Sequence, residues 1–248
     1  MLNPFSIATA LIYLPSIAAK QLNIHAKILS PSNTTISSTN RQITSSLSSP
    51  SDQKINFQTT HDAHATLYLT TFLDESIGEL VGAANTAIQG AYAEFCHEGE
   101  GMSVGETKNA QGSYGMLEVV NTPCLQALSD AVVNATSPFL DPSAKTYIPS
   151  WVYSLPDDER DQKIALIHQY GSPNVFEGFE PHVTLVGDSV SSEEMNAVFD
   201  ATPFDPLTST IGEVGFGSVG EFGTVLKGQD VASPVILVGE KAGQTEVN

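Results

Sequence analysis

The sequence predicts an α+β fold, because β-favouring runs and helical patterns alternate along most of its length. The run ATLYLTTFL (65–73) is typical of a strand, and apolar residues recur at helical spacing between 75 and 95. The same order returns later, with a strand pattern at 181–187 and a helix pattern at 191–201. This repeated order suggests an internal duplication.

Glycine and proline indicate where the elements between and after these segments begin and end. Glycines in 97–115 predict a long loop, and MLEVV (116–120) predicts a second strand. Pro123 is expected to open a helix that continues to 135. We further expect a helix at 156–169 and a meander of strands at 207–238.

The N-terminal region is expected to lie outside the folded domain. Residues 4–19 are apolar and uncharged, too short for a membrane span, and a signal peptide is predicted at 1–18 with cleavage after Ala18. The alternative is a buried or disordered N-terminal helix. A Ser/Thr-rich arm is expected at 19–53, followed by one domain at 54–248. A cleaved signal implies a secreted or periplasmic protein, and an uncleaved one a cytoplasmic protein.

Charge narrows the range of partners. The chain carries 28 acidic and 10 basic side chains, with a formal net charge of −18. Long nucleic acids and anionic membranes bind through many Lys and Arg contacts, so neither is an expected partner. We expect a monomer that takes a small anionic ligand in a local pocket.

Cys96 and Cys124 are the two cysteines and allow one intramolecular pairing. An exported chain favours a disulfide between them, whereas a cytosolic chain favours two buried thiols.

Two short segments share the pattern His-x-Thr-Leu, at His64 and at His182. Alternate side chains of a strand share a face, so His64 would lie beside Thr66, and His182 beside Thr184. If the two strands are neighbours, one cleft would hold two imidazoles and two hydroxyls.

Such a set has a clear chemical use. One imidazole can activate water while the other protonates a leaving oxygen, and threonine hydroxyls can hold phosphate oxygens. Nothing in this chemistry requires a metal ion or a cofactor. The alternative is that both pairs are accidental and each histidine is hydrogen-bonded locally within its strand.

The segments HATL and PHVTL resemble the two signature motifs of the 2H phosphoesterase superfamily, which includes 2'-5' RNA ligase-like proteins and cyclic nucleotide phosphodiesterases. The context Phe179-x-Pro181-His182-x-Thr184-Leu185 and the later run GEVGFGSVGEFGTVL are also similar. The resemblance covers about 54–238. It implies two pseudo-two-fold related β/α lobes around a central cleft, catalytic histidines at 64 and 182, and phosphate-binding threonines at 66 and 184.

The resemblance implies a metal-independent phosphoesterase that hydrolyses 2',3'-cyclic phosphates or 2'-5' phosphodiesters. Many RNA-processing members have a basic residue after the second motif, where this chain has Val186-Gly187-Asp188, so a small nucleotide or cyclic phosphate is the expected substrate. Two alternatives stay open: a catalytically silent protein that binds nucleotide or phosphate, and a 2'-5' RNA ligase. Tyr68 is expected on the His64 face, where it could stack on a base, and Trp151 is a weaker candidate.

Gly215, Gly217 and Gly220 match the glycine pattern of dinucleotide-binding loops. Such a loop must open a helix, whereas EFGTVL continues here as a strand pattern. We therefore expect these glycines to serve turns or a bulge.

Overall fold

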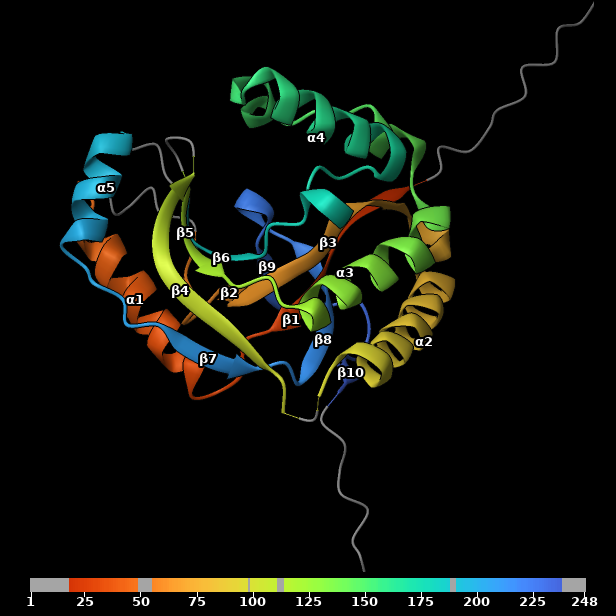
Figure 1. Cartoon of the computed structure of the whole chain (residues 1–248), viewed down its shortest axis with the longest axis horizontal. Helices are drawn as coiled ribbons and strands as arrows, with labels where there is room; N and C mark the ends of the chain where they lie inside the picture. The colour runs from red at the N-terminus through yellow and green to blue at the C-terminus, as the bar shows by residue number, and fades with distance from the viewer. Residues whose placement is uncertain (1–17, 49–54, 98, 111–113, 188–190, 238–248) are drawn as a thin grey trace, which may run out of the picture.

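Two antiparallel β-sheets form the centre of a mixed α+β molecule, and helices cover their outer faces (Figure 1). The computed structural model describes residues 18–48, 55–97, 99–110, 114–187 and 191–237. The predicted signal peptide at 1–18 lies, apart from Ala18, outside the described residues.

The larger sheet, sheet A, has the strand order β2-β9-β8-β1-β3, and β10 also pairs with β8. Its strands are β1 (Ala19–Lys27), β2 (His61–Asp62), β3 (His64–Leu73), β8 (Glu213–Val219), β9 (Val225–Asp230) and β10 (Val235–Ile236). The strand patterns predicted at 65–73 and in the C-terminal region are confirmed.

Strand β1 corrects the expectation of a Ser/Thr-rich arm at 19–53. It lies between β3 and β8 and pairs with both. Leu22, Ile24 and Ala26 are fully buried on one face, and Asn23 and His25 are fully buried on the other, as expected for a strand inside a sheet that is covered on both sides. After it, α1 (Ser32–Ser46) buries Ile36 and Ile43. Residues 19–27 and 32–46 are therefore part of the folded domain, although the composition of this segment is polar.

The smaller sheet, sheet B, has the order β6-β5-β4-β7. Its strands are β4 (Gly101–Ala110), β5 (Tyr114–Val119), β6 (His182–Gly187) and β7 (Leu207–Thr210). The long loop predicted at 97–115 is wrong, because most of it is β4, paired with β5 and β7. Met102 and Val104 are buried in alternation with residues that are small, so the glycines concealed a strand pattern.

The helices cover the two sheets from opposite sides (Figure 1). Helices α2 (Ile77–Phe95) and α3 (Pro123–Thr136) pack together beside β3, while α1 and α5 (Ser192–Asp200) contact sheet B. Helix α4 (Asp157–Tyr170) packs on two short 3-10 turns, η4 (Pro142–Lys145) and η5 (Ser150–Ser154). The helices predicted from periodicity are confirmed, and the hydroxyl of Thr122 caps α3 ahead of Pro123.

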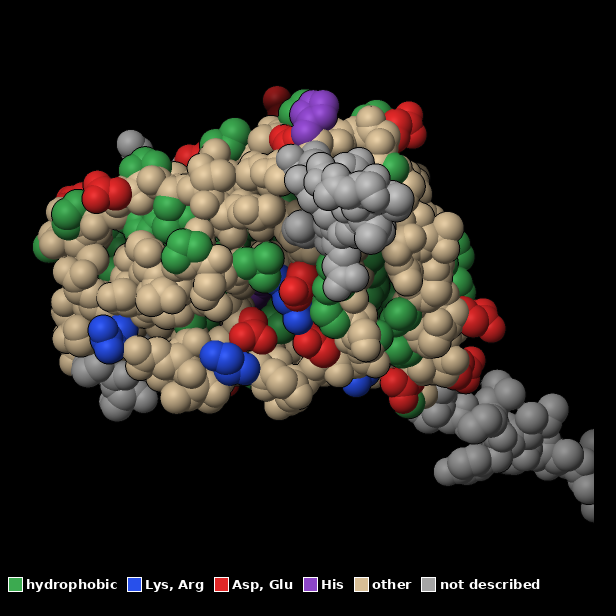
Figure 2. Space-filling model, turned by 90° about the horizontal axis from the view of Figure 1, so that it is seen from below, with side chains coloured by type: hydrophobic (Ala, Val, Ile, Leu, Met, Phe, Trp, Pro, Cys, Tyr) green, Lys and Arg blue, Asp and Glu red, His purple; other side chains and the backbone are tan. Residues whose placement is uncertain are grey.

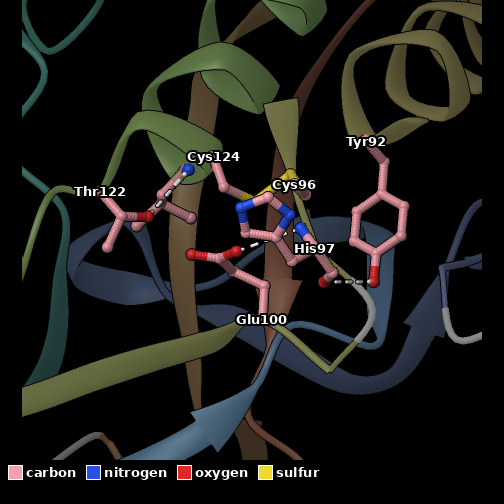
Figure 3. The surroundings of a disulfide bond; sticks show 7 residues. Tyr92, Cys96, His97, Glu100, Thr122 and Cys124 are labelled. Carbon is pink, nitrogen blue, oxygen red and sulfur yellow. Dashed lines mark hydrogen bonds between the residues drawn. A yellow bond between two sulfur atoms is a disulfide. The ribbon is translucent and has the colours of Figure 1, made fainter. Parts of the chain in front are cut away.

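Cys96 and Cys124 form a disulfide bond, which decides the pairing that the sequence left open. The bond connects the residue after α2 to the first turn of α3 (Figure 3). Beside it, the backbone N–H of His97 donates to the Glu100 carboxylate at 3.1 Å, and the Tyr92 hydroxyl donates to the His97 carbonyl at 3.4 Å. The two helices that cover sheet A are thereby joined covalently.

The surface is sparsely charged, as the composition indicates. Figure 2 shows one face on which neutral side chains and backbone dominate and charged side chains occur in small groups. Among the described helices, none is both long enough and apolar enough to span a bilayer.

Candidate active site

A cleft of about 1430 Å³ is lined by both sheets and by the segment that includes η4, η5 and α4. Strand β3 of sheet A and strand β6 of sheet B contact each other. Three of the predicted site residues, Thr66, His182 and Thr184, line this cleft. Residues from both His-x-Thr segments therefore meet in one place.

His64, the fourth residue of this set, lies deeper. It is 5% exposed and is not among the residues that line the cleft. It is nevertheless connected to the cleft, because the Asn23 amide nitrogen lies 3.2 Å from His64 Nε2 and donates to the hydroxyl of Thr66, which lines the cleft. The arrangement has one partly accessible imidazole, at His182, and one buried imidazole behind it.

A β-bulge at Leu67, directly after Thr66, ends the first motif. In the β1–β3 pairing, Ile24 lies opposite Tyr68 and His25 opposite Thr66, so Leu67 has no partner in β1. An extra residue reverses the faces of all side chains beyond it. Leu69 and Thr71 consequently continue the cleft lining in place of Tyr68.

The prediction that Tyr68 shares the face of His64 and lines the cleft is wrong for this reason. Its side chain is fully buried, packs edge to face with Phe72, and donates its hydroxyl to the Tyr170 carbonyl at 2.5 Å. Burial raises the pKa of the Tyr68 hydroxyl, so Tyr68 is a structural residue.

The second motif is followed by a bulge at the equivalent place. Met116 lies opposite Thr184 and Gly115 opposite Val186, which leaves Leu185 without a partner in β5. The threonine of each pair thus lines the cleft, while the next two residues, Leu67 and Tyr68 or Leu185 and Val186, are buried. The shared Leu of the two motifs is the bulged residue in both strands.

Three histidines share one hydrogen-bond pattern. The Nδ1 atoms of His25, His64 and His182 bond to the backbone carbonyl two residues earlier, at 3.0, 2.7 and 2.8 Å respectively. A carbonyl can only accept, so Nδ1 carries the hydrogen and the Nε2 lone pair of each neutral ring is left to act as a base.

Asn23 connects the first motif to the turn η7 (Glu221–Gly223). Its Nδ2 atom lies 3.2 Å from His64 Nε2 and 2.9 Å from both Thr66 Oγ1 and the Gly223 carbonyl. Because Thr66 Oγ1 accepts from Asn23, the hydroxyl hydrogen of Thr66 can be donated to a ligand. Asn23 is fully buried and therefore orients both members of the motif.

His25 is another buried imidazole, and it lies directly beside His64. The ring centroids are 5.1 Å apart, and burial lowers the pKa of His25 to about 4. Burial, followed by the neighbouring His25, lowers the pKa of His64 to about 3. Burial also lowers the pKa of His182, opposed by its hydrogen bond to the Glu180 carbonyl and by the Glu180 charge. All three rings are consequently neutral at pH 7.

Lys163 fixes the backbone that leads into the second motif. Lys163 is only 2% exposed. Its ammonium group donates hydrogen bonds to Asn174 Oδ1, the Gly178 carbonyl and Glu180 Oε1, each at 3.0 Å. The Glu180 carbonyl in turn accepts from His182 Nδ1. Lys163 thus positions His182 through Glu180.

The glycines of β8 make room for this site. A Cβ at position 215 would lie 2.6 Å from His25 Nε2, and one at 217 would lie 2.5 Å from Val225 Cγ1. The expectation of turns is confirmed for Gly220, which precedes the turn η7 (Glu221–Gly223), but is wrong for Gly215 and Gly217, which lie inside β8. The strand pattern expected from Glu221 is also interrupted by that turn and resumes at Val225.

Asn23, His25 and Lys163 are site residues that lie outside both His-x-Thr motifs, so the motifs do not indicate them. The segment QLNIHAK does carry a usable signal, because its polar residues alternate with buried Leu22, Ile24 and Ala26. Lys163 carries none, since a lysine in a helix is ordinarily exposed and its three partners lie in a later segment.

The described residues contain no group of three or more His, Cys, Asp or Glu side chains arranged to hold a metal ion. A family model described as "Protein of unknown function (DUF1045)" matches residues 80–213, slightly more than half of the chain. The matched segment contains His182 and Thr184 and begins after β3. No curated protein matches the chain significantly.

Proposed function

This chain belongs to the DUF1045 family of proteins of unknown function, and we propose that it is a phosphoesterase of the 2H type. Its substrates would be 2',3'-cyclic phosphates or 2'-5' phosphodiesters of small nucleotides. His64 and His182 would exchange protons with the substrate, and Thr66 and Thr184 would bind the phosphate.

The observation that carries this proposal is the meeting of the two motifs. Thr66, His182 and Thr184 line one cleft, and the Asn23 amide contacts both His64 Nε2 and the Thr66 hydroxyl. The equivalent bulges after Thr66 and Thr184 further support two related β/α lobes. Accidental His-x-Thr pairs give no reason for this shared placement.

The surroundings of the two rings favour different roles. His64 is buried among other imidazoles, whereas Glu180 beside His182 favours a proton on that ring. We assign His64 as the base and His182 as the acid, which takes up its proton when the anionic substrate binds. Water attacks phosphorus and gives a proton to His64 Nε2, the P–O2' or P–O3' bond breaks, and His182 Nε2 protonates the leaving oxygen.

A phosphorus NMR time course with 2',3'-cyclic mononucleotides tests this reaction. We expect the wild type to convert the cyclic phosphate signal to a monoester signal. His64→Ala and His182→Ala should each lower the rate about 10²- to 10⁴-fold, the usual contribution of a general acid or base.

The matched control is His168→Ala, because His168 is an exposed histidine that does not line the cleft. This variant should keep the wild-type rate. Turnover that survives in His64→Ala and His182→Ala alike, or that is lost equally in His168→Ala, would contradict the proposed roles.

One observation favours a second candidate, a protein that binds nucleotides without turnover. His64 is 5% exposed, and its Nε2 atom faces the Asn23 amide at 3.2 Å, where a catalytic base needs contact with water. Nucleotide binding with an unchanged phosphorus spectrum would support this candidate over the enzyme.

We also propose that the protein is exported. Disulfides persist in oxidising compartments, and Cys96 is bonded to Cys124. Since β1 begins at Ala19, removal of residues 1–18 would leave all the described strands and helices intact. Mass spectrometry of the protein recovered outside the cytoplasm should give a chain beginning at Ala19, whereas an intact N-terminus on a cytoplasmic protein would contradict export.

A further inference from the structure

The cleft is larger than a phosphate group requires. Its volume of about 1430 Å³ exceeds the roughly 300–1,000 Å³ of common ligand pockets. The part that we call the outer arm is formed by lining residues of the turns η4 and η5 and of the chain between them, together with Leu155 and Glu159. From the turns and the connecting chain these are Ser143, Ala144, Thr146, Tyr147, Pro149, Ser150 and Trp151. This arm is available for the rest of a substrate whose phosphate contacts the two threonines.

Uncharged side chains dominate the outer arm. Tyr147 and Trp151 provide aromatic rings, and Tyr147 is 72% exposed although it is large and hydrophobic. The other uncharged lining residues of the arm are Ser143, Ala144, Thr146, Pro149, Ser150 and Leu155. Aromatic faces beside hydroxyl groups suit a flat heterocycle joined to a sugar.

The charges of the cleft oppose a second phosphate. Among the described lining residues, Lys163 is the one Lys or Arg, and it already donates to the Glu180 carboxylate. Glu159 adds a carboxylate within the arm itself. A phosphate placed in the arm would meet negative charge in a partly enclosed space, where repulsion is stronger than in bulk water.

We infer that the outer arm binds an uncharged nucleoside, with its base against Trp151, and discriminates against nucleotides that carry a further phosphate. This inference rests on the proposed function, because it assumes that the substrate phosphate lies at Thr66 and Thr184. It identifies Trp151 and Glu159 as specificity residues.

Calorimetric binding tests the inference with three probes: glycerol 2-phosphate, adenosine 3'-phosphate and adenosine 3',5'-bisphosphate. We expect adenosine 3'-phosphate to bind at least tenfold more tightly than either of the others. Trp151→Ala should remove the advantage over glycerol 2-phosphate, while Trp151→Phe should keep most of it, because a ring still stacks on the base.

Glu159→Gln should reduce the preference for the monophosphate over the bisphosphate at least threefold. Asp158→Asn is the matched control. It removes one negative charge from the residue before Glu159, and the Asp158 side chain is exposed and does not line the cleft. Equal affinity for glycerol and adenosine phosphates, or tighter binding of the bisphosphate, would overturn the inference.

Hydrolysis assays separate this inference from the proposed function. The expected binding pattern without hydrolysis of any cyclic nucleotide would overturn the catalytic role and leave the outer arm intact. Hydrolysis of cyclic phosphates with no effect of Trp151 or Glu159 substitutions would do the reverse. Absence of both binding and hydrolysis would overturn both proposals.

Discussion

His25 of β1 and His64 of the neighbouring strand β3 meet edge to face in sheet A, with ring centroids 5.1 Å apart and planes inclined by 67°. His25 is fully buried, and its Nε2 atom has no hydrogen-bond partner among the described protein atoms. Burial lowers the pKa of both rings, and the close contact means that protonation of one ring disfavours protonation of the other. This relationship makes the properties of His64 depend on a residue outside both motifs.

Replacing His25 should change the titration of His64. The neighbouring His25 contributes to lowering the pKa of His64 to about 3, so His25→Leu should raise that pKa. Imidazole proton NMR between pH 3 and 7 would measure the shift, with the exposed His168→Leu as the control. An unchanged His64 titration in His25→Leu would show that the contact has no electrostatic role.

Acidification should destabilise the protein through the same pair. In the unfolded chain both histidines have a pKa near 6.5, whereas in the fold the values are about 4 for His25 and 3 for His64. The unfolded state therefore binds more protons below pH 6.5, and stability falls as the pH falls. Each histidine contributes a slope of about 1.4 kcal/mol per pH unit between pH 6 and 4.5.

Urea unfolding at several pH values measures this loss of stability. The variant with both His25→Leu and His64→Gln should lose these two contributions, so its stability should vary less steeply over the same interval. A slope equal to that of the wild type would assign the acid sensitivity to other groups.

Asn23→Asp should raise the pKa of His64. The substitution places a carboxylate where the amide Nδ2 now lies 3.2 Å from His64 Nε2, and an adjacent negative charge favours the protonated imidazole. We expect a rise of about one unit or more by NMR titration. For an active enzyme, the acid limb of the kcat/KM profile should move to higher pH, and an unmoved limb would argue against His64 as the base.

Lys163→Met should weaken both stability and the placement of His182. The substitution removes three hydrogen bonds from a buried ammonium group, with an expected loss of about 2 kcal/mol in the free energy of unfolding. Turnover should fall through kcat more than through KM, because the acid is displaced. Lys145→Met, on the neighbouring turn η4 and outside the cleft lining, should keep both values.

Removing the disulfide should destabilise the fold without abolishing the cleft chemistry. Cys96 and Cys124 are 28 residues apart in sequence, and a loop of this size corresponds to about 3–4 kcal/mol of stabilisation. Chemical unfolding of the variant with Cys96→Ala and Cys124→Ala would measure the loss. A stability equal to that of the wild type would show that α2 and α3 hold together without the bond.

The fold class and most elements could be predicted from the sequence because apolar periodicity reports directly on which face is buried. Strand β3, helices α2, α3 and α5 and strand β6 carry that signal. Helix α4 has little apolar periodicity, and Pro156 followed by three acidic residues marks its start instead. Strand β1 was missed because three buried apolar residues precede a long polar segment. Strand β4 was missed because Gly101, Ser103 and Gly105, which alternate with buried Met102 and Val104, are small residues that also occur in loops.

Site residues could be predicted from the sequence only where they belong to a short local motif. The two His-x-Thr pairs indicate which side chains share a strand face, and Thr66, His182 and Thr184 do line the cleft. Tyr68 was placed wrongly because strict alternation gives no warning of the bulge at Leu67. Asn23, His25 and Lys163 act through partners far away in the chain, and their contacts depend on the tertiary fold.

The paths of β1 and α1 make the two halves of the molecule interdependent. Strand β1 lies between β8 and β3 in sheet A, yet α1, which follows directly, packs against β6 of sheet B. Sheet A also joins strands from both ends of the chain, so no single cut yields a half with a complete core. The protein should therefore unfold in one cooperative step, and fragments divided at any loop should regain structure only by reassociating with each other.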